Sequence, residues 1–329
     1  MLLASLQLLA GFALLMFGGE FLVRGAVRIA AKMGMSQLLV GLTIVSLGTS
    51  SPELAASLQA SLSGSPGLAL GNIAGSNIAN LLLILGVAAL ILPLKVPRGT
   101  LWRDGGIGVA AVLALLAAGH LGGLSRFAGA ILLAALAAYL VTAYRKEMRG
   151  NNHSAAFDMA AAASEFDPAL SPKAESKGTL LVPIVMVVLS LGLIILGGKL
   201  LVDSAVLIAQ DFGVSDATIG LTVVALGTSM PELVTSIIAA SRKEGEIVLG
   251  NVLGSNIYNL LFIGGITGAI APTVIPDSIL RFDLWLVLAA SLAVMLFAYT
   301  GGRLNRWEGS ALLGAYLAYI AMTVGLFPT

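Results

Sequence analysis

Apolar runs of about 20 residues recur along this chain, and an α-helix of that length crosses the hydrocarbon core of a bilayer. Hydrophobic residues make up 58% of the sequence and charged residues 11%, so the chain has more apolar surface than a water-soluble fold could bury. The sequence therefore predicts a polytopic membrane protein of the all-α class. We place ten transmembrane helices, at residues 2–23, 37–62, 68–92, 104–121, 125–144, 179–201, 212–240, 247–271, 282–300 and 308–327.

Basic residues are distributed unevenly between the loops that join the ten predicted spans. If the N-terminus lies outside, 15 of the 18 Lys and Arg residues fall on the cytoplasmic side, and only Arg126, Lys199 and Arg281 do not. Loops rich in Lys and Arg stay in the cytoplasm. We therefore expect a multi-pass protein of the plasma membrane, surrounded by the lipid bilayer, with both termini outside and a cytoplasmic loop at 145–178.

The composition argues against several classes of function. A net charge of +1 argues against nucleic acid as a partner, and 0 Cys with 2 His argues against disulfide, thiolate or histidine-based metal chemistry. The chain has no Ser–His or metal–His arrangement of the kind that catalysis uses. The sequence therefore predicts a protein that is not an enzyme, needs no cofactor and has no evident obligate protein partner.

Two long motifs each occur twice, at a constant spacing of 179 residues. Residues 41–53 match residues 220–232 at 10 of 13 positions, and residues 71–86 match residues 250–265 at 11 of 16 positions. No insertion separates the copies across these motifs. The two halves of the chain are therefore related by a duplication.

The duplication divides the chain into a first unit at 1–144, a linker at 145–178 and a second unit at 179–329. Each unit has five predicted spans, an odd number, so the second unit must enter the membrane from the opposite face. Inverted repeats of this kind are a recurring plan of secondary transporters. The expected architecture is thus two inverted-topology repeats of five helices.

Each repeat places one carboxylate inside an apolar segment, Glu53 in the first and Glu232 in the second. A charged side chain at the centre of a bilayer costs roughly 2.5–3.5 kcal/mol on insertion scales, so two at matched positions need a shared reason. The simplest reason is a bound cation. The alternative is a pair of protonated, hydrogen-bonded acids in the core, and the duplication of the whole surrounding motif argues against it.

Oxygen atoms that could bind a cation surround both carboxylates. Pro52 and Pro231 each lack a backbone N–H, so carbonyl groups in the preceding turn lose their usual partners. Residues three or four apart share a helix face, so four helices can direct polar groups to one centre. The candidate oxygens are the carbonyls near Thr49 and Thr228, the hydroxyls of Ser50, Ser229, Ser76 and Ser255, and the amides of Asn80 and Asn259.

A set of ligands made only of oxygen indicates which ion such a site prefers. Calcium takes about 6–8 oxygen ligands in flexible geometry, whereas magnesium demands a strict octahedron. Zinc and copper prefer nitrogen or sulfur. We therefore rank calcium first, with sodium as its co-substrate.

Two motifs in consecutive predicted helices are each present twice. They are Gly-Thr-Ser-x-Pro-Glu and Gly-Asn-x-x-Gly-Ser-Asn-Ile-x-Asn. Together they resemble the two alpha-repeats of the sodium/calcium exchanger family, within the calcium/cation antiporter superfamily. The resemblance covers the repeats closely and extends to the ten-span plan. It implies antiport of three sodium ions for one calcium ion by alternating access.

The resemblance also implies where the ions bind. Calcium would be held by Glu53, Glu232 and the carbonyls of Thr49 and Thr228. Sodium positions would be shared by two groups of residues, namely Thr49, Ser50, Glu53, Ser255 and the Ser46 carbonyl, and Thr228, Ser229, Glu232, Ser76 and the Ala225 carbonyl.

Some relatives, including the potassium-dependent branch, carry Asp where Asn259 stands, so Asn at this position argues against potassium dependence.

Two other functions remain open at this point. A calcium/proton or other cation/proton exchanger would use the same carboxylates, and a cation channel would conduct without an obligatory counter-flux.

The resemblance further implies that the first and sixth helices move across the core. We expect four more amides to bridge or pack helices rather than to bind ions, namely Asn72, Asn77, Asn251 and Asn256.

Acid should inhibit transport if the two carboxylates bind the ion. A carboxylic acid removed from water binds a proton more readily than one in water, and a protonated group no longer neutralises a cation. We expect calcium uptake into proteoliposomes to decline as the pH is lowered. A calcium flux that is indifferent to pH would count against carboxylate ligation.

Overall fold

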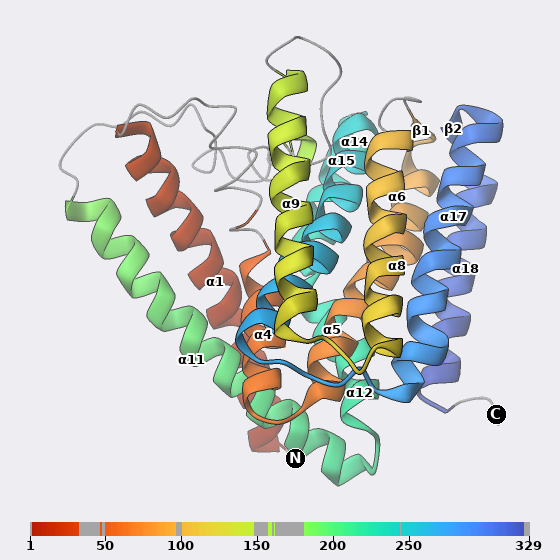
Figure 1. Cartoon of the computed structure of the whole chain (residues 1–329). Coiled ribbons are helices and arrows are strands. Elements are labelled where there is room, and N and C mark those ends of the chain that lie inside the picture. Colours follow the sequence, from red (N-terminus) through yellow and green to blue (C-terminus); the bar gives the residue numbers. More distant parts are fainter. Residues whose placement is uncertain are drawn as a thin grey trace.

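The computed structural model describes residues 2–32, 47, 50–96, 101–147, 157–159, 161, 181–243 and 245–325, and helices dominate this part of the chain (Figure 1). Seven of these helices are long and apolar enough to cross a membrane, and an eighth span is added if the bent pair Asp216–Thr228 and Met230–Ser241 counts as one. The second predicted span, 37–62, is described mainly by its last 12 residues, and the tenth is an 18-residue helix. The chain is thus a helical membrane protein with many spans.

The first unit contains, in chain order, α1 (Leu2–Lys32), α4 (Ser51–Leu62), α5 (Pro66–Ile78), η2 (Ala79–Ile84), α6 (Leu85–Ile91), β1 (Leu94–Lys95), η3 (Leu101–Gly105), α8 (Gly106–His120) and α9 (Arg126–Glu147). The second unit contains α11 (Leu181–Phe212), α12 (Asp216–Ile219), η5 (Gly220–Val224), α13 (Ala225–Thr228), α14 (Met230–Ser241), α15 (Gly245–Ile257), η6 (Tyr258–Ile263), α16 (Gly264–Ile270), η7 (Ile279–Asp283), α17 (Leu284–Gly301), β2 (Arg303–Leu304) and α18 (Arg306–Thr323). The elements written η are π-helical turns.

Four consecutive elements of the first unit recur in the second with both bounds shifted by 179 residues. α4 corresponds to α14, α5 to α15, η2 to η6 and α6 to α16. The agreement includes the π-helical turns η2 and η6, whose wider backbone no hydropathy pattern predicts. The duplication in the sequence is therefore also a duplication of local structure.

The residue that precedes α4 and α14 departs from helical geometry in the same way in both units. Ser50 has φ −84° and ψ 8°, and its repeat-mate Ser229 has φ −85° and ψ 9°. Pro52 and Pro231 follow two residues later, where a missing N–H and a bulky ring disturb the preceding turn. The predicted single span at 212–240 is therefore two helices bent by 47°.

α1 and α11 lie side by side along one edge of the bundle (Figure 1). Small residues bring their backbones together: a Cβ added to Gly11 would lie 2.7 Å from the Leu201 nitrogen, and one added to Gly197 would lie 2.9 Å from the Leu14 Cβ. Both helices are longer than the predictions 2–23 and 179–201, since no proline interrupts them past the apolar run. Gly213, at φ 65°, follows the end of α11.

The α1–α11 pair contacts one end of the remaining bundle. The terminal face is the end of the bundle at which α1 begins, α4 ends and α12 begins (Figure 1). The linker face is the opposite end, at which α9 ends and α11 begins. Among the described elements, α1 and α11 contact chiefly α4, α12 and α13. Gly19 of α1 faces Ser51, and Gly198 of α11 faces Ala55, both on α4. The pair therefore packs on the half of the bundle nearer the terminal face.

Two short strands of two residues each were not predicted, and they leave the predominantly helical class unchanged. β1 and β2 pair antiparallel, with Leu94 opposite Leu304 and Lys95 opposite Arg303. Leu124 and Thr273 form a further isolated bridge. Backbone groups in the loops between spans need hydrogen-bond partners, and these pairings satisfy them while joining loops of the two units.

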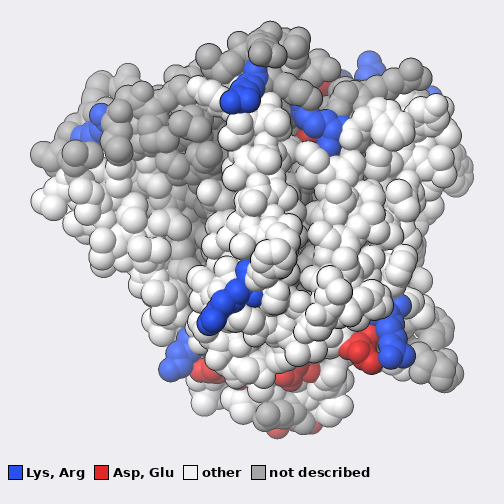
Figure 2. All heavy atoms as spheres, in the orientation of Figure 1, with Lys and Arg blue, Asp and Glu red and all other residues white. Residues whose placement is uncertain are grey.

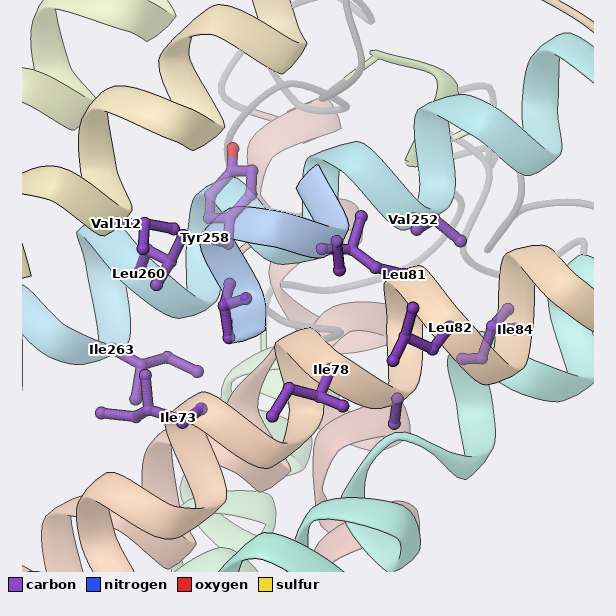
Figure 3. Packing of buried hydrophobic residues seen from close by; sticks show 14 of the residues in the cluster. Ile73, Ile78, Leu81, Leu82, Ile84, Val112, Val252, Tyr258, Leu260 and Ile263 are labelled. Carbon is purple, nitrogen blue, oxygen red and sulfur yellow. The ribbon is translucent and has the colours of Figure 1, made fainter. Parts of the chain in front are cut away.

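The two helical segments that carry the repeated Gly-Asn motif form the centre of the bundle. The apolar windows of Pro66–Ile91 and Gly245–Ile270 are 83% and 89% buried, whereas those of α1, α9 and α11 are 28% buried. Both segments contribute to one buried apolar core, with Ile73, Ile78 and Leu81 from the first and Val252 and Leu260 from the second (Figure 3). In Figure 2 the middle of the outer surface is mostly uncharged, and most charged side chains gather toward its two ends.

Enlarging a glycine between α1 and α11 should destabilise the protein. A methyl group at Gly11 would press on the backbone of α11, which cannot move aside, and overpacking of this kind costs about 1–3 kcal/mol. We expect Gly11→Ala to lower the unfolding temperature measured in detergent. Gly192→Ala, on α11 with no atom within 4 Å of the added Cβ, is the matched control and should not lower it, because alanine favours a helix over glycine. Equal effects of the two changes would contradict the packing described.

Candidate cation site

The two repeated carboxylates occupy equivalent, deeply buried positions. Glu53 lies in the first turn of α4 and Glu232 in the first turn of α14, and they are 2% and 4% exposed. They come close enough for their negative charges to repel each other, and Ser229 of the second unit lies beside Glu53 of the first. Neither forms an ion pair with a Lys or Arg of the described residues. The structure therefore brings together two acidic groups from opposite halves of the chain.

Buried oxygen atoms that lack a hydrogen-bond partner are concentrated at the predicted site. Leaving such an atom without a partner costs about 1–3 kcal/mol, so most buried polar groups in proteins are paired. Six of the nine unpaired side-chain atoms found among the described residues belong to predicted site residues, namely Oε2 of Glu53 and Glu232, Oγ of Ser76, Ser229 and Ser255, and Oδ1 of Asn80. This pattern suits a group of oxygens that a cation completes, and it argues against two acids already satisfied within the core.

The hydroxyls and amides of the site come from the two central helices. Ser76 lies on α5 and Ser255 on α15, one turn before Asn80 and Asn259. All four side chains are at most 2% exposed. Asn80 and Asn259 are each the second residue of a π-helical turn, η2 and η6, where one extra residue per turn re-aims the side chains that follow.

Amide side chains join the acidic helices to the central ones. The Asn72 amide donates to the Glu53 carbonyl at 3.1 Å and to Ser57 Oγ at 2.8 Å. In the second unit the Asn251 amide donates to the Glu232 carbonyl, also at 3.1 Å, and to Ser236 Oγ at 2.9 Å. The prediction that these amides bridge helices is confirmed.

Two further hydrogen bonds connect the halves of the chain. The Asn80 amide donates to Asn256 Oδ1 at 2.9 Å, and the Thr228 hydroxyl donates to Asn72 Oδ1 at 3.1 Å. Asn256 is thus a bridging amide, as predicted. Asn77 differs, because its amide donates to the Ile73 carbonyl of its own helix at 2.7 Å.

The remaining predicted residues differ in what the structure says of them. Ser50, Thr228 and Ala225 are buried. The Ala225 carbonyl, implied as a sodium ligand, accepts the Ser229 N–H at 3.0 Å and the Thr228 hydroxyl at 3.3 Å. The two other residues implied by the resemblance, Thr49 and Ser46, lie outside the described residues.

Sequence reasoning missed a second pair of buried carboxylates, at the start of the predicted fourth and ninth spans. Asp104 forms two 2.8 Å hydrogen bonds with Arg103 and accepts one from the Tyr139 hydroxyl at 3.3 Å. Asp283 accepts a hydrogen bond from the Tyr319 hydroxyl at 2.9 Å. An acidic residue at matched positions of both repeats was the available signal. Each of these carboxylates has a hydrogen-bonding partner, unlike Oε2 of Glu53 and Glu232.

The arrangement defines a class of protein. Within the described chain no three His, Cys, Asp or Glu side chains cluster, so a metal site rich in such ligands is not seen there. Two carboxylates and several neutral side chains, each with an oxygen that lacks a hydrogen-bond partner, are instead buried in the interior of a helical bundle long enough to span a membrane. Intramembrane carboxylates that face the bundle interior mark ion pathways, which indicates an integral membrane protein that transports ions.

Comparison with known proteins gives the family. Residues 3–145 and 182–325 match the model of the sodium/calcium exchanger protein family. The sodium/calcium exchanger MaX1 of Methanosarcina acetivorans is 34% identical, over 96% of this chain and 97% of that protein. The inner membrane protein YrbG of Escherichia coli is 33% identical, over 100% of this chain and 99% of that protein.

Solved structures agree with the sequence relatives. The sodium-calcium exchanger NCX_Mj, solved after soaking with sodium and strontium, superposes with a TM-score of 0.61 at 30% identity, over 97% of this chain and 98% of that one. The chain belongs to the sodium/calcium exchanger protein family. It is therefore an ion transporter rather than an enzyme.

Removing a bridging amide should destabilise the acidic helix of its unit. Asn251→Leu removes the amide that donates to the Glu232 carbonyl and to the hydroxyls of Thr235 and Ser236, and each lost hydrogen bond costs about 0.5–1.5 kcal/mol net. We expect a lower unfolding temperature in detergent. Ser241→Ala removes only an exposed hydroxyl bonded to its own helix and serves as the control, with little change expected. An unchanged unfolding temperature in Asn251→Leu would show that the bridging amide does not contribute to stability.

Proposed function

We propose that this protein exchanges sodium for calcium across the plasma membrane by alternating access, with three sodium ions carried for one calcium ion. The observation that carries the proposal is the convergence of Glu53 and Glu232, from opposite repeats, among buried oxygens without hydrogen-bond partners. The family to which the chain belongs and its similarity to MaX1 and NCX_Mj support the choice of ions.

Charge balance explains why two carboxylates suit both ions. Together Glu53 and Glu232 carry two negative charges when ionised, which one calcium ion neutralises. Three sodium ions spread over the same oxygens leave one positive charge in excess. Each cycle then moves one net charge, so the exchange is electrogenic and the membrane potential contributes about 2.3 kcal/mol per 100 mV to it.

The proposed ligands are those that the family resemblance implies, and several of them carry buried oxygens without a hydrogen-bond partner. Calcium binds to Glu53 and Glu232 with the carbonyls of Thr49 and Thr228. Sodium occupies overlapping positions that include the hydroxyls of Ser76 and Ser255, one from each central helix. Asn80 and Asn259 line the position between the two carboxylates. The remaining contributors are Ser50, Ser229 and the carbonyls of Ser46 and Ala225.

Alternating access follows from the repeats. Two inverted units of five helices, ten in all, would let the α1–α11 pair move from one half of the bundle to the other by exchanging the roles of the repeats. In the structure the pair lies against α4 and α12, near the terminal face. The distribution of basic residues puts the terminal face outside and the 145–178 loop in the cytoplasm.

Calcium flux in proteoliposomes tests this function directly. We expect calcium uptake into sodium-loaded vesicles when external sodium is removed, and faster uptake when an imposed potential favours the net charge movement. Glu53→Gln and Glu232→Gln should each abolish uptake, because one remaining carboxylate cannot neutralise calcium. Asp277→Asn, at an exposed carboxylate paired with Arg281, is the matched control and should retain uptake.

The cation/proton exchanger is the alternative that the same experiment separates. Calcium uptake driven by a proton gradient in the absence of sodium would favour it over sodium exchange. Calcium uptake that requires neither a sodium gradient nor a proton gradient would favour a channel. Retention of sodium-driven uptake in both glutamine variants would show that the carboxylates do not carry the transported ion.

A further inference from the structure

Four asparagines of the repeated Gly-Ser-Asn-Ile-x-Asn motif form two potential cross-links between the halves of the chain. The repeat maps Asn80 onto Asn259 and Asn256 onto Asn77, so the pair Asn80–Asn256 has Asn259–Asn77 as its counterpart. All four side chains are at most 5% exposed. Identical residues at both places allow identical hydrogen bonds.

Only one of the two cross-links is closed in the structure. The Asn80 amide donates to Asn256 Oδ1 at 2.9 Å. In the counterpart pair, the Asn77 amide is turned toward the Ile73 carbonyl of its own helix, at 2.7 Å, and its Oδ1 has no hydrogen-bond partner. Asn259 donates no hydrogen bond to Asn77 among the described residues. The bundle is therefore asymmetric at a position where its sequence is symmetric.

The closed cross-link orients a residue of the proposed cation site. With its amide nitrogen used by Asn256, Asn80 keeps its Oδ1 without a protein partner. That oxygen is then available to a cation, whereas an amide turned by half a rotation would present N–H groups, which repel one. Asn256 thus acts on the site through Asn80 and does not need to touch an ion.

A second asymmetry accompanies the first. The α1–α11 pair contacts α4, and the contacts with α14, the repeat-mate of α4, are much less extensive. If the two units exchange roles, α14 takes the place of α4 and Asn77 takes the place of Asn256. The same exchange would open the Asn80–Asn256 cross-link and close Asn259–Asn77.

We propose that Asn256 and Asn77 are positioning residues that form alternating latches, each holding the central asparagine of the opposite repeat in one of the two end states of the transporter. This rests on the alternating access proposed above, though not on which ions are carried. Asn256 stabilises the state seen here, with α1 and α11 against α4. Asn77 stabilises the state in which they lie against α14.

Distance measurements between spin labels can test the latches, because the chain has 0 Cys and accepts labelled cysteines without background. One pair of labels replaces Leu62 and Phe212, exposed residues at the terminal-face ends of α4 and α11. A second pair replaces Leu181 and Ser241, at the linker-face ends of α11 and α14. Exchange of states should lengthen the first distance and shorten the second.

The two leucine variants should shift the populations in opposite directions. Asn256→Leu should lower the population of the present state relative to the exchanged state by about two- to tenfold. This is the range expected from the loss of one net hydrogen bond. Asn77→Leu should raise that relative population by a similar factor. In the double variant the shifts should largely cancel. Asn256→Asp, which keeps the acceptor oxygen, should shift the ratio less than Asn256→Leu.

Loss of packing alone would not give this pattern. General destabilisation would broaden the distances or shift both variants in the same direction, and either result would overturn the latches, as would no shift in either variant. Flux through the unlabelled protein, measured in parallel, separates the two proposals. If the two variants shift the populations in opposite directions but the protein does not exchange sodium for calcium, the proposal on the latches stands and the proposed transported ions are wrong.

Discussion

Two carboxylates buried near enough to repel each other, inside a membrane protein, impose the main constraint on this structure. Glu53 and Glu232 repel each other, lack a basic partner among the described residues, and each keeps an oxygen without a hydrogen bond. Removing ions from water is costly, and a membrane interior offers no water to compensate. Under the proposed function, a transported cation would remove the repulsion and complete the unpaired oxygens, and its departure would restore both. A site with this property suits a transporter, because its ligands are never permanently satisfied.

The starts of α4 and α14 and the bridging amides position the two carboxylates. Pro52 and Pro231 lie in the first turn of α4 and of α14, together with Glu53 and Glu232, and the free N–H groups of a first turn favour a negative charge. Asn72 and Asn251 then bind the carbonyls of the same two glutamates and hold α4 and α14 to the central helices. Function and stability thus share the same residues.

Much of this arrangement could be predicted from the sequence, because the duplication compares the chain with itself. The matched positions of Glu53 and Glu232 predicted their convergence. The prolines predicted a disturbed turn before each carboxylate, but not the division of the span at 212–240 into two helices. The π-helical turns, the β1–β2 pairing and the full lengths of α1 and α11 depend on tertiary contacts that no local pattern contains. The orientation of Asn77 could not be predicted either, since its repeat-mate Asn256 lies in the same Gly-Ser-Asn-Ile-x-Asn motif and has a different partner.

The most direct test of the central claim is a crystal structure soaked with calcium or strontium and examined by anomalous scattering. The account predicts one divalent ion within about 2.3–2.6 Å of carboxylate oxygens of both Glu53 and Glu232. The ion should be absent from crystals of Glu53→Gln. A divalent ion bound elsewhere, or one bound by a single carboxylate while the other faces only protein, would contradict the account.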